Sequence, residues 1–294
     1  MAKFRSLREH LAGSDLAPFL EFHEPETPDL ALIEAVHDPA YVTDFLAGRL
    51  DAKAMRRIGL PWSEALARRA RIAVGGTLLT ARLALEHGMS CNTAGGTHHA
   101  FPDYGSGFCI FNDLAVAARA LLDEEHVGRV LIVDLDVHQG DGTARIFREE
   151  PRVFTFSMHC AQNFPMQKET SDLDVALPAG TGDADYLTAL AGHLPDLLDR
   201  LAPDLVLYDA GVDPHEHDKL GKLALTDAGL YERDGSVLSA CRQRGLPVAS
   251  VIGGGYADDI DALVARHAIL HAAAVAVWRG GLESPREQER THAT

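Results

Sequence analysis

The pattern of apolar and polar residues changes about a third of the way along the chain. Before residue 85, apolar residues recur at spacings of three and four, as in KFRSLREHL and EALARRARIAVGGTLLTARLALEHG, which predicts amphipathic helices. Later, continuous apolar runs alternate with helical stretches. The predicted strands are RVLIVDLD, RVFTFSMH, DLVLYDAG and PVASVIGGG, and the helices between them lie in GTARIFREE, DYLTALAGHLPDLLDRL and TDAGLYERDGSVLSACRQRG.

Continuous apolar strands separated by helices are typical of a parallel sheet that is covered on both faces. We therefore predict an α/β fold with three α/β/α layers around a central, mostly parallel sheet. No repeat, long linker or change of composition divides the sequence, so we expect one domain over residues 1–294. The polar end of the chain, about residues 281–294, is expected to be a frayed tail.

Charge and cysteine content exclude several classes of function. The chain has 43 acidic and 27 basic residues, a net charge of −16, which argues against nonspecific nucleic-acid or anionic-membrane binding. An acidic surface suits cationic ligands, such as lysine-rich peptides or polyamines, although most of these charges need no role beyond solubility. The four cysteines form no CxxC pair, and neither a signal sequence nor an uninterrupted membrane span is evident. We expect a cytoplasmic protein with no membrane or nucleic-acid partner.

Polar residues follow each of the four predicted strands. In open parallel sheets, ligands bind in the crevice beyond the carboxyl ends of the strands, so we expect one site there. The residues that these strand ends deliver are Asp134, Asp136 and His138, then Ser157 and His159, then Asp209 and Asp213, and finally Gly253–Tyr256.

The spacing of DLDVH points to a metal. Alternate residues of an extended chain face the same way, so Asp134, Asp136 and His138 can reach one centre. Two carboxylates and an imidazole form a plausible three-ligand set for Zn²⁺, which in catalytic sites keeps an open position for water. A structural salt-bridge network is the alternative that the spacing leaves open.

Two glycine-rich segments carry further chemistry. His98 and His99 lie in one of them, and a metal-activated water needs a neighbouring base while a leaving amine needs an acid. Carboxylates such as Asp134 and Asp141 are suited to orient the two rings. The other segment, GGGY, ends in Tyr256, whose hydroxyl suits a developing oxyanion, an interaction worth ~3 kcal/mol. An incidental histidine pair and a simple glycine turn are the alternatives.

Together these segments resemble the zinc-dependent histone deacetylase family of the arginase/deacetylase fold. The matching stretches are GGTHHAFPDYGSGFCIFND, VLIVDLDVHQGDGT, TFSMH, DAGVDPHEHDKLG and GGGY. They occur in the family's order and cover most of residues 90–256.

The resemblance implies two cation sites and changes the ligand set that spacing suggests. Asp136, His138 and Asp213 would be the zinc ligands, and Asp134 drops out of that set. Family members also hold a structural potassium or sodium ion beside the zinc. The segments that would bind it match Asp134, Asp136, His138, Ser157 and Met158.

The resemblance also implies catalytic roles. His99 would be the main general base and acid, and His98 an electrostatic partner. Asp134 would pair with His98, and Asp141 with His99. Tyr256 would polarise the scissile carbonyl together with zinc.

The substrate tunnel follows from the same resemblance. Gly107 and Phe108 would line it, Phe164 is the candidate for its second aromatic wall, and Leu220 would shape its mouth. Gln139 stands where many deacetylases have a second histidine. This makes the chain closest to class IV and its bacterial relatives, a branch in which longer acyl chains are possible substrates.

The implied activity is that of a hydrolase acting on linear amides, which removes acetyl or longer acyl groups from N-acyl-lysine side chains or from a similar acylated amine. An acetylpolyamine or other small-molecule deacylase is one alternative. A catalytically silent module that binds acyl-lysine is another. The remaining histidines on predicted helices, His267 among them, are expected to be surface or packing residues.

One departure concerns the start of the chain. Family members usually open with a strand and a loop, whereas MAKFRSLREHL is already a predicted helix. Either the start codon lies upstream or the sheet lacks an edge, and in both cases the sequence given would leave a strand edge open.

Overall fold

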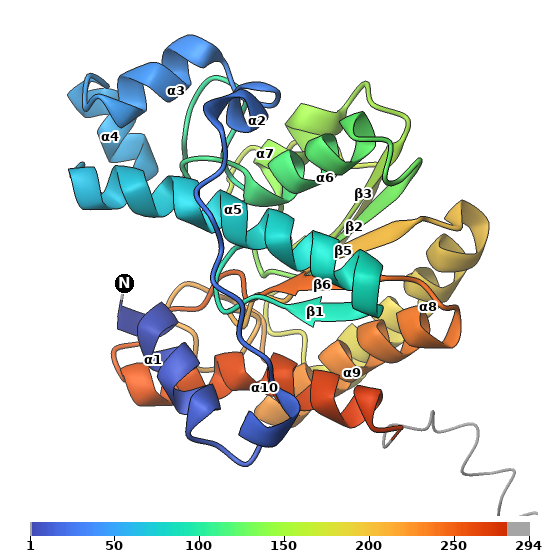
Figure 1. Ribbon diagram of the computed structural model, residues 1–294. Helices are drawn as coiled ribbons and strands as arrows, with labels where there is room; N and C mark the ends of the chain where they lie inside the picture. Colours follow the sequence, from blue (N-terminus) through green and yellow to red (C-terminus); the bar gives the residue numbers. More distant parts are fainter. Residues whose placement is uncertain (1, 281–294) are drawn as a thin grey trace, which may run out of the picture.

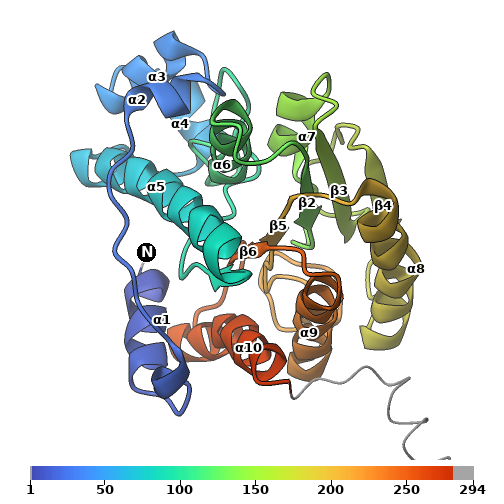
Figure 2. The ribbon, with the colours of Figure 1, turned by 45° about the vertical axis from the view of Figure 1, so that its right-hand side comes forward.

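The structure is a computed structural model that describes residues 2–280. The strands of these residues form one six-stranded sheet in which every pairing is parallel, in the order β1-β6-β5-β2-β3-β4 (Figures 1 and 2). The α/β fold with a parallel sheet is therefore confirmed. The strands are β1 (Met89–Cys91), β2 (Val130–Asp134), β3 (Val153–Cys160), β4 (Leu173–Leu177), β5 (Leu205–Asp209) and β6 (Val248–Val251).

Both faces of the sheet are covered, because side chains of a strand alternate between its two faces. In β2, Val130 and Ile132 join one apolar cluster, and Leu131 and Val133 join another. The first cluster is covered by α5 (Glu64–His87), α6 (Asp113–Asp123) and α7 (Asp141–Phe147). The second is covered by α8 (Asp183–Leu201), α9 (Asp227–Gln243) and α10 (Ile260–Trp278).

The first 60 residues contain several short helices. Helix α1 (Ala2–Ala12) packs against α10, with Leu7 and Leu11 fully buried (Figure 2). A 3₁₀ turn and an extended segment then lead to three short helices that form a third apolar cluster against α5. These elements are the 3₁₀ turn Ala17–Phe19, α2 (Leu30–Glu34), α3 (Pro39–Leu46) and α4 (Ala52–Ile58).

Helix α10 corrects one expectation. Among the described residues it is the helix whose length and composition would allow it to cross a membrane, although no membrane-spanning window was expected from the sequence. Half of that window is buried inside the fold, where α10 packs against α9 and α1. A helix enclosed on several sides is apolar all round, which explains why its composition resembles that of a membrane span.

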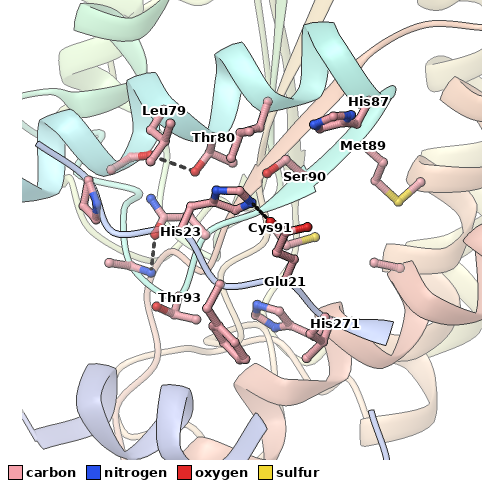
Figure 3. Close-up of a pocket in the computed structure, with 18 of the residues that line it drawn as sticks. Glu21, His23, Leu79, Thr80, His87, Met89, Ser90, Cys91, Thr93 and His271 are labelled. Atoms are coloured by element: carbon pink, nitrogen blue, oxygen red, sulfur yellow. Dashed lines mark hydrogen bonds and ion pairs between the residues drawn. The ribbon is translucent and has the colours of Figure 1, made fainter. Parts of the chain in front are cut away.

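Strand β1 forms one edge of the sheet. This strand is at the end of the sheet order, so among residues 2–280 no strand pairs with its outer side. A cavity of about 610 Å³ lies beside it, between β1, α5, α10 and the extended segment 19–25 (Figure 3).

Candidate metal and catalytic site

The strand ends meet as the sequence predicts. The loops after β2 and β6 and the glycine-rich loop before α6 border a cavity of about 400 Å³. Parallel pairing places Asp134 at the end of β2 beside Asp209 of β5 and Ser157 of β3. The cavity-lining residues that the sequence singled out are His98, His99, Gly107, Phe108, Asp136, His138, Gly253, Gly254, Gly255 and Tyr256.

Three buried side chains converge in a way that fits a metal. The Nδ1 atom of His138 lies 3.0 Å from Oδ1 of Asp136 and 3.1 Å from Oδ2 of Asp213. One ligand atom from each of the three residues lies within 4.8 Å of the others. Backbone N–H groups fix the remaining oxygens, since Gly254 donates to Oδ2 of Asp136 at 2.7 Å and Val137 to Oδ1 of Asp213 at 2.8 Å.

The charges of these three residues also fit a cation. Burial opposes charge on His138, yet Asp136 and Asp213 raise its pKa to about 10. Burial, together with the charge of Asp136, raises the pKa of Asp213 to about 7. A histidine that binds a metal must be a neutral imidazole, and with His138 neutral the two ionised carboxylates leave surplus negative charge, which a divalent cation would balance. The donor set of two oxygens and one nitrogen suits zinc.

The two adjacent histidines each rest on a carboxylate. Nδ1 of His98 lies 2.7 Å from Oδ2 of Asp134, and Nδ1 of His99 lies 2.6 Å from Oδ1 of Asp141. All four side chains are buried. The structure thus brings together the pairs that the family resemblance implies, and it places Asp134 on His98 rather than with Asp136 and His138.

The side chains around His98 and His99 give the two rings different charges. Burial alone would lower the pKa of His98, but Asp134 and Asp136 raise it well above the usual value, so this ring is protonated. Burial and the neighbouring His98 lower the pKa of His99 to about 4, so this ring is neutral. Because Nδ1 of His99 donates to Asp141, its Nε2 atom is free to accept a proton.

Of the two predicted tunnel aromatics, Phe108 lines the cavity and Phe164 lies beside His99 without lining it. The ring of Phe164 packs edge-on against His99 at 4.9 Å between centroids, and Phe108 lies 5.8 Å from the ring of Tyr256. A Cβ atom on Gly107 would lie 2.6 Å from Cδ2 of His99, so only glycine fits there. Phe108 and Phe164 remain 44% and 41% exposed, which leaves them available to an entering chain. Burial raises the pKa of Tyr256 well above its usual value, so its hydroxyl stays a donor.

The other predicted contacts lie around this centre. Leu220 is 44% exposed and does not line the cavity, but its carbonyl accepts a 2.6 Å hydrogen bond from Nδ2 of Asn163, which lies 3.4 Å from Nε2 of His138. The side chain of Met158 is buried in the core, so its backbone alone is available to a cation. The hydroxyl of Ser157 lies 3.0 Å from Nδ1 of His159. Cation binding at Ser157 and Met158 stays a prediction.

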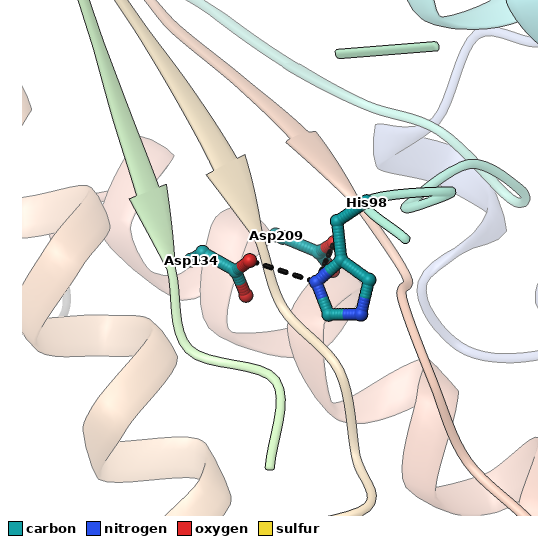
Figure 4. Close-up of side chains that lie close together, drawn as sticks. All are labelled: His98, Asp134 and Asp209. Atoms are coloured by element: carbon teal, nitrogen blue, oxygen red, sulfur yellow. Dashed lines mark hydrogen bonds and ion pairs between the residues drawn. The ribbon is translucent and has the colours of Figure 1, made fainter. Parts of the chain in front are cut away.

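Asp209 has no role in the sequence prediction beyond its place at a strand end. It is fully buried, and Oδ2 lies 3.9 Å from Nδ1 of His98 (Figure 4). Neither of its oxygens has a hydrogen-bond partner among the described residues. Burial and the charge of Asp134 raise its pKa well above the usual value, so Asp209 is a neutral acid. The signal was present in the sequence, because an aspartate ended a fully apolar strand.

Lys3 is a second residue that the sequence prediction missed. Its ammonium lies within 3.4 Å of the carbonyls of Gly253 and Gly255, directly before Tyr256. Lys3 lies on an ordinary amphipathic helix, and nothing in its local pattern marks it.

Comparisons with known proteins agree with this geometry. Residues 1–272 match the family model described as histone deacetylase domain. An uncharacterized protein of Picosynechococcus sp. is 59% identical over 278 residues, which cover 95% of this chain and 93% of that protein. A probable deacetylase of Methanothermobacter thermautotrophicus is 32% identical over 271 residues, with 86% and 78% covered. The crystal structure of the HDA15 HD domain has the same fold, with a TM-score of 0.75, 24% identity and coverage of 96% and 82%.

Proposed function

The chain belongs to the histone deacetylase family, and we propose that it is a zinc-dependent deacylase that hydrolyses N-acyl-lysine side chains. The family supports the coarser assignment, a hydrolase with deacetylase activity. One observation carries the finer proposal. A convergent Asp–His–Asp ligand set reaches one cavity through Asp136 and His138, and a neutral histidine held by a carboxylate and a protonated tyrosine line the same cavity.

Asp136, His138 and Asp213 would hold the zinc ion. A bound zinc ion supplies a Lewis acid for the acyl carbonyl and lowers the pKa of a water molecule to ~7. We also propose a structural potassium or sodium ion at the segments around Asp134 and Ser157, which are neighbours in β2 and β3.

His99 moves the proton. Its Nε2 atom accepts a proton from the attacking water and returns it to the nitrogen of the leaving lysine, a role that requires a neutral ring at the start. Asp141 holds the ring in the tautomer that leaves Nε2 free. His98 keeps its proton and stabilises the negative charge that develops on the acyl group.

Tyr256 donates its hydroxyl hydrogen to the oxygen of the acyl group as negative charge builds there. Such a donor is worth ~3 kcal/mol in the transition state. Because the pKa of Tyr256 is raised, its hydroxyl keeps this hydrogen at neutral pH.

The substrate side chain would enter between Phe108 and Phe164. The extended, apolar methylene chain of an acylated lysine suits a passage with aromatic walls. Gln139 is consistent with a class IV branch and longer acyl groups. It is buried, and its amide exchanges hydrogen bonds of 2.8 and 2.9 Å with the backbone of Glu169, so it fixes the segment that follows Phe164.

The test is hydrolysis of one lysine peptide that carries acyl groups from acetyl to myristoyl, with zinc-loaded protein and with chelated protein. We expect turnover that disappears with the chelator and returns with zinc, and a preference for longer chains. If no acyl length is hydrolysed faster than by the His99→Ala variant, the proposal is wrong. Preferred turnover of acetylspermidine in direct competition would instead assign a polyamine deacylase.

A further inference from the structure

The loop that carries Tyr256 is held from two sides. The peptide unit between Gly253 and Gly254 donates its N–H to Oδ2 of Asp136 at 2.7 Å, and its carbonyl lies 3.4 Å from Nζ of Lys3. The N–H and C=O of a trans peptide point in opposite directions. This peptide plane is therefore fixed between a candidate metal ligand and an ammonium group.

The same arrangement recurs one peptide further on. The unit between Gly255 and Tyr256 donates its N–H to Oδ2 of Asp218 at 2.7 Å, and its carbonyl lies 3.4 Å from the same Nζ atom of Lys3. The carbonyl of Gly254, between them, accepts a 2.8 Å hydrogen bond from Val212. Every peptide that leads to Tyr256 thus has a partner, and a single ammonium serves two of them.

A third acceptor completes the surroundings of the ammonium. A lysine ammonium has three N–H donors and no acceptor. Nε2 of His267 lies 3.3 Å from Nζ of Lys3, which together with the two carbonyls gives three acceptors. Burial and the nearby lysine lower the pKa of His267 well below its usual value, so its ring is neutral and able to accept.

The position of Lys3 is set by the packing of α1. Leu7 and Leu11 lie on the same helix and are fully buried in the cluster that includes α10, the helix that carries His267. Arg69 of α5 stacks on the ring of Phe4 at 4.3 Å from its centroid and holds the start of α1 from the other side. Burial lowers the pKa of Lys3 to about 8, partly offset by Asp213 and Asp136, so the ammonium persists at neutral pH.

We propose that Lys3 is a positioning residue for the reaction: through the carbonyls of Gly253 and Gly255 it orients the hydroxyl of Tyr256 toward the acyl group. This inference rests on the proposed function for its kinetic consequences, but its structural content does not. Lys3 itself does not touch the reacting atoms and acts through the loop.

The kinetic test compares Lys3→Met and Lys3→Arg in the full chain, with Lys53→Met on the exposed surface of α4 as the matched control. We expect Lys3→Met to lower kcat by about 10- to 100-fold with a smaller change in KM, because a misplaced group far from the substrate's binding contacts costs this much. Lys3→Arg should recover most of the loss, and Lys53→Met should be unchanged.

A double-mutant cycle separates positioning from general damage. If Lys3 acts through Tyr256, Lys3→Met should lower kcat by less than about threefold in a Tyr256→Phe background, because the hydroxyl is already absent. A full additive loss in that background overturns the proposal. Equal zinc content and an unchanged melting temperature of the variants confirm that the comparison is between folded, loaded proteins.

Hydrogen exchange provides a readout that needs no substrate. We expect the amides of Gly254 and Tyr256 to exchange at least about tenfold faster in Lys3→Met, while the amides of β6 stay protected. Unchanged exchange at both amides overturns the proposal, whatever the kinetics. If the natural chain hydrolyses no acyl substrate while exchange at these two amides accelerates as expected, the proposed function fails and the positioning inference stands.

Discussion

His98 and His99 are consecutive residues with almost the same contacts, but the ring of His98 is charged and the ring of His99 is neutral. Both are buried, and their Nδ1 atoms lie 2.7 Å and 2.6 Å from a carboxylate. Asp134 and Asp136 overcome the effect of burial and raise the pKa of His98, whereas His99 has one carboxylate and a charged neighbour whose ring centroid is 4.1 Å away. The histidine pair thus supplies two imidazoles, and the charges around each ring decide which one can act as a base.

The largest effect should come from the neutral ring. We expect His99→Ala to lower kcat/KM by about 1,000-fold or more, since it removes the proposed general base and acid. Initial rates on the best acyl-lysine peptide measure this, with zinc content as the control. A loss smaller than that of His98→Ala would reverse the assignment of roles.

His98 does not transfer the proton, but its positive charge affects the pKa of His99. We expect His98→Ala to lower kcat by about 100-fold through lost electrostatic stabilisation. The variant should also move the acid limb of the pH profile to higher pH, because the positive charge of His98 helps to lower the pKa of His99. A limb that stays in place would show that the two rings are not coupled.

The pH profile of the natural protein tests the same coupling. The active form of His99 is the neutral ring, and its lowered pKa of about 4 keeps that form dominant from neutral pH down to about pH 5. Activity should therefore be nearly constant over that range and should fall about tenfold per unit below pH 4. Zinc content measured at each pH separates protonation of His99 from loss of metal, and a midpoint near 6.5 in loaded protein would contradict the prediction.

The smallest effect is expected at Asp209. Because this buried side chain is a neutral acid, Asp209→Asn preserves its size and its charge. We expect kcat to change by less than about threefold, and the free energy of unfolding by less than about 1 kcal/mol, the typical effect of a point mutation, because no hydrogen-bond partner is lost. Chemical denaturation and kinetics measure the two. A loss as large as that of Asp134→Asn would mean that Asp209 is charged and helps to hold the proton on His98.

The fold was predictable where burial is uniform. Strands β2, β5 and β6 are buried at every residue, so they read as continuous apolar runs. The edge strands β1 and β4 were missed, because three half-buried residues in β1 and five residues of mixed exposure in β4 give no such run. The short helix α4 was missed as well. A short element that packs on one side alone contains too few apolar residues for its hydrophobic pattern to be recognised.

Site residues could be predicted together from the sequence when they lie close to one another along the chain. Asp134, Asp136 and His138 lie within five residues, and the predicted strand end brings them together. Asp213 was expected near the site, but it entered the ligand set only through the family resemblance, because it reaches His138 from the loop after β5. Lys3 could not be found at all, since its contacts with Gly253 and Gly255 span 250 and 252 residues of sequence.

The distance between α1 and α10 along the chain has a consequence for biosynthesis. Leu7 and Leu11 are translated well before α10, the helix against which α1 packs. At about 5–20 residues per second, the roughly 250 residues between them take about 13–50 s to translate. Throughout that interval the apolar face of α1 has no helix α10 to cover it, and this leaves the nascent segment open to aggregation.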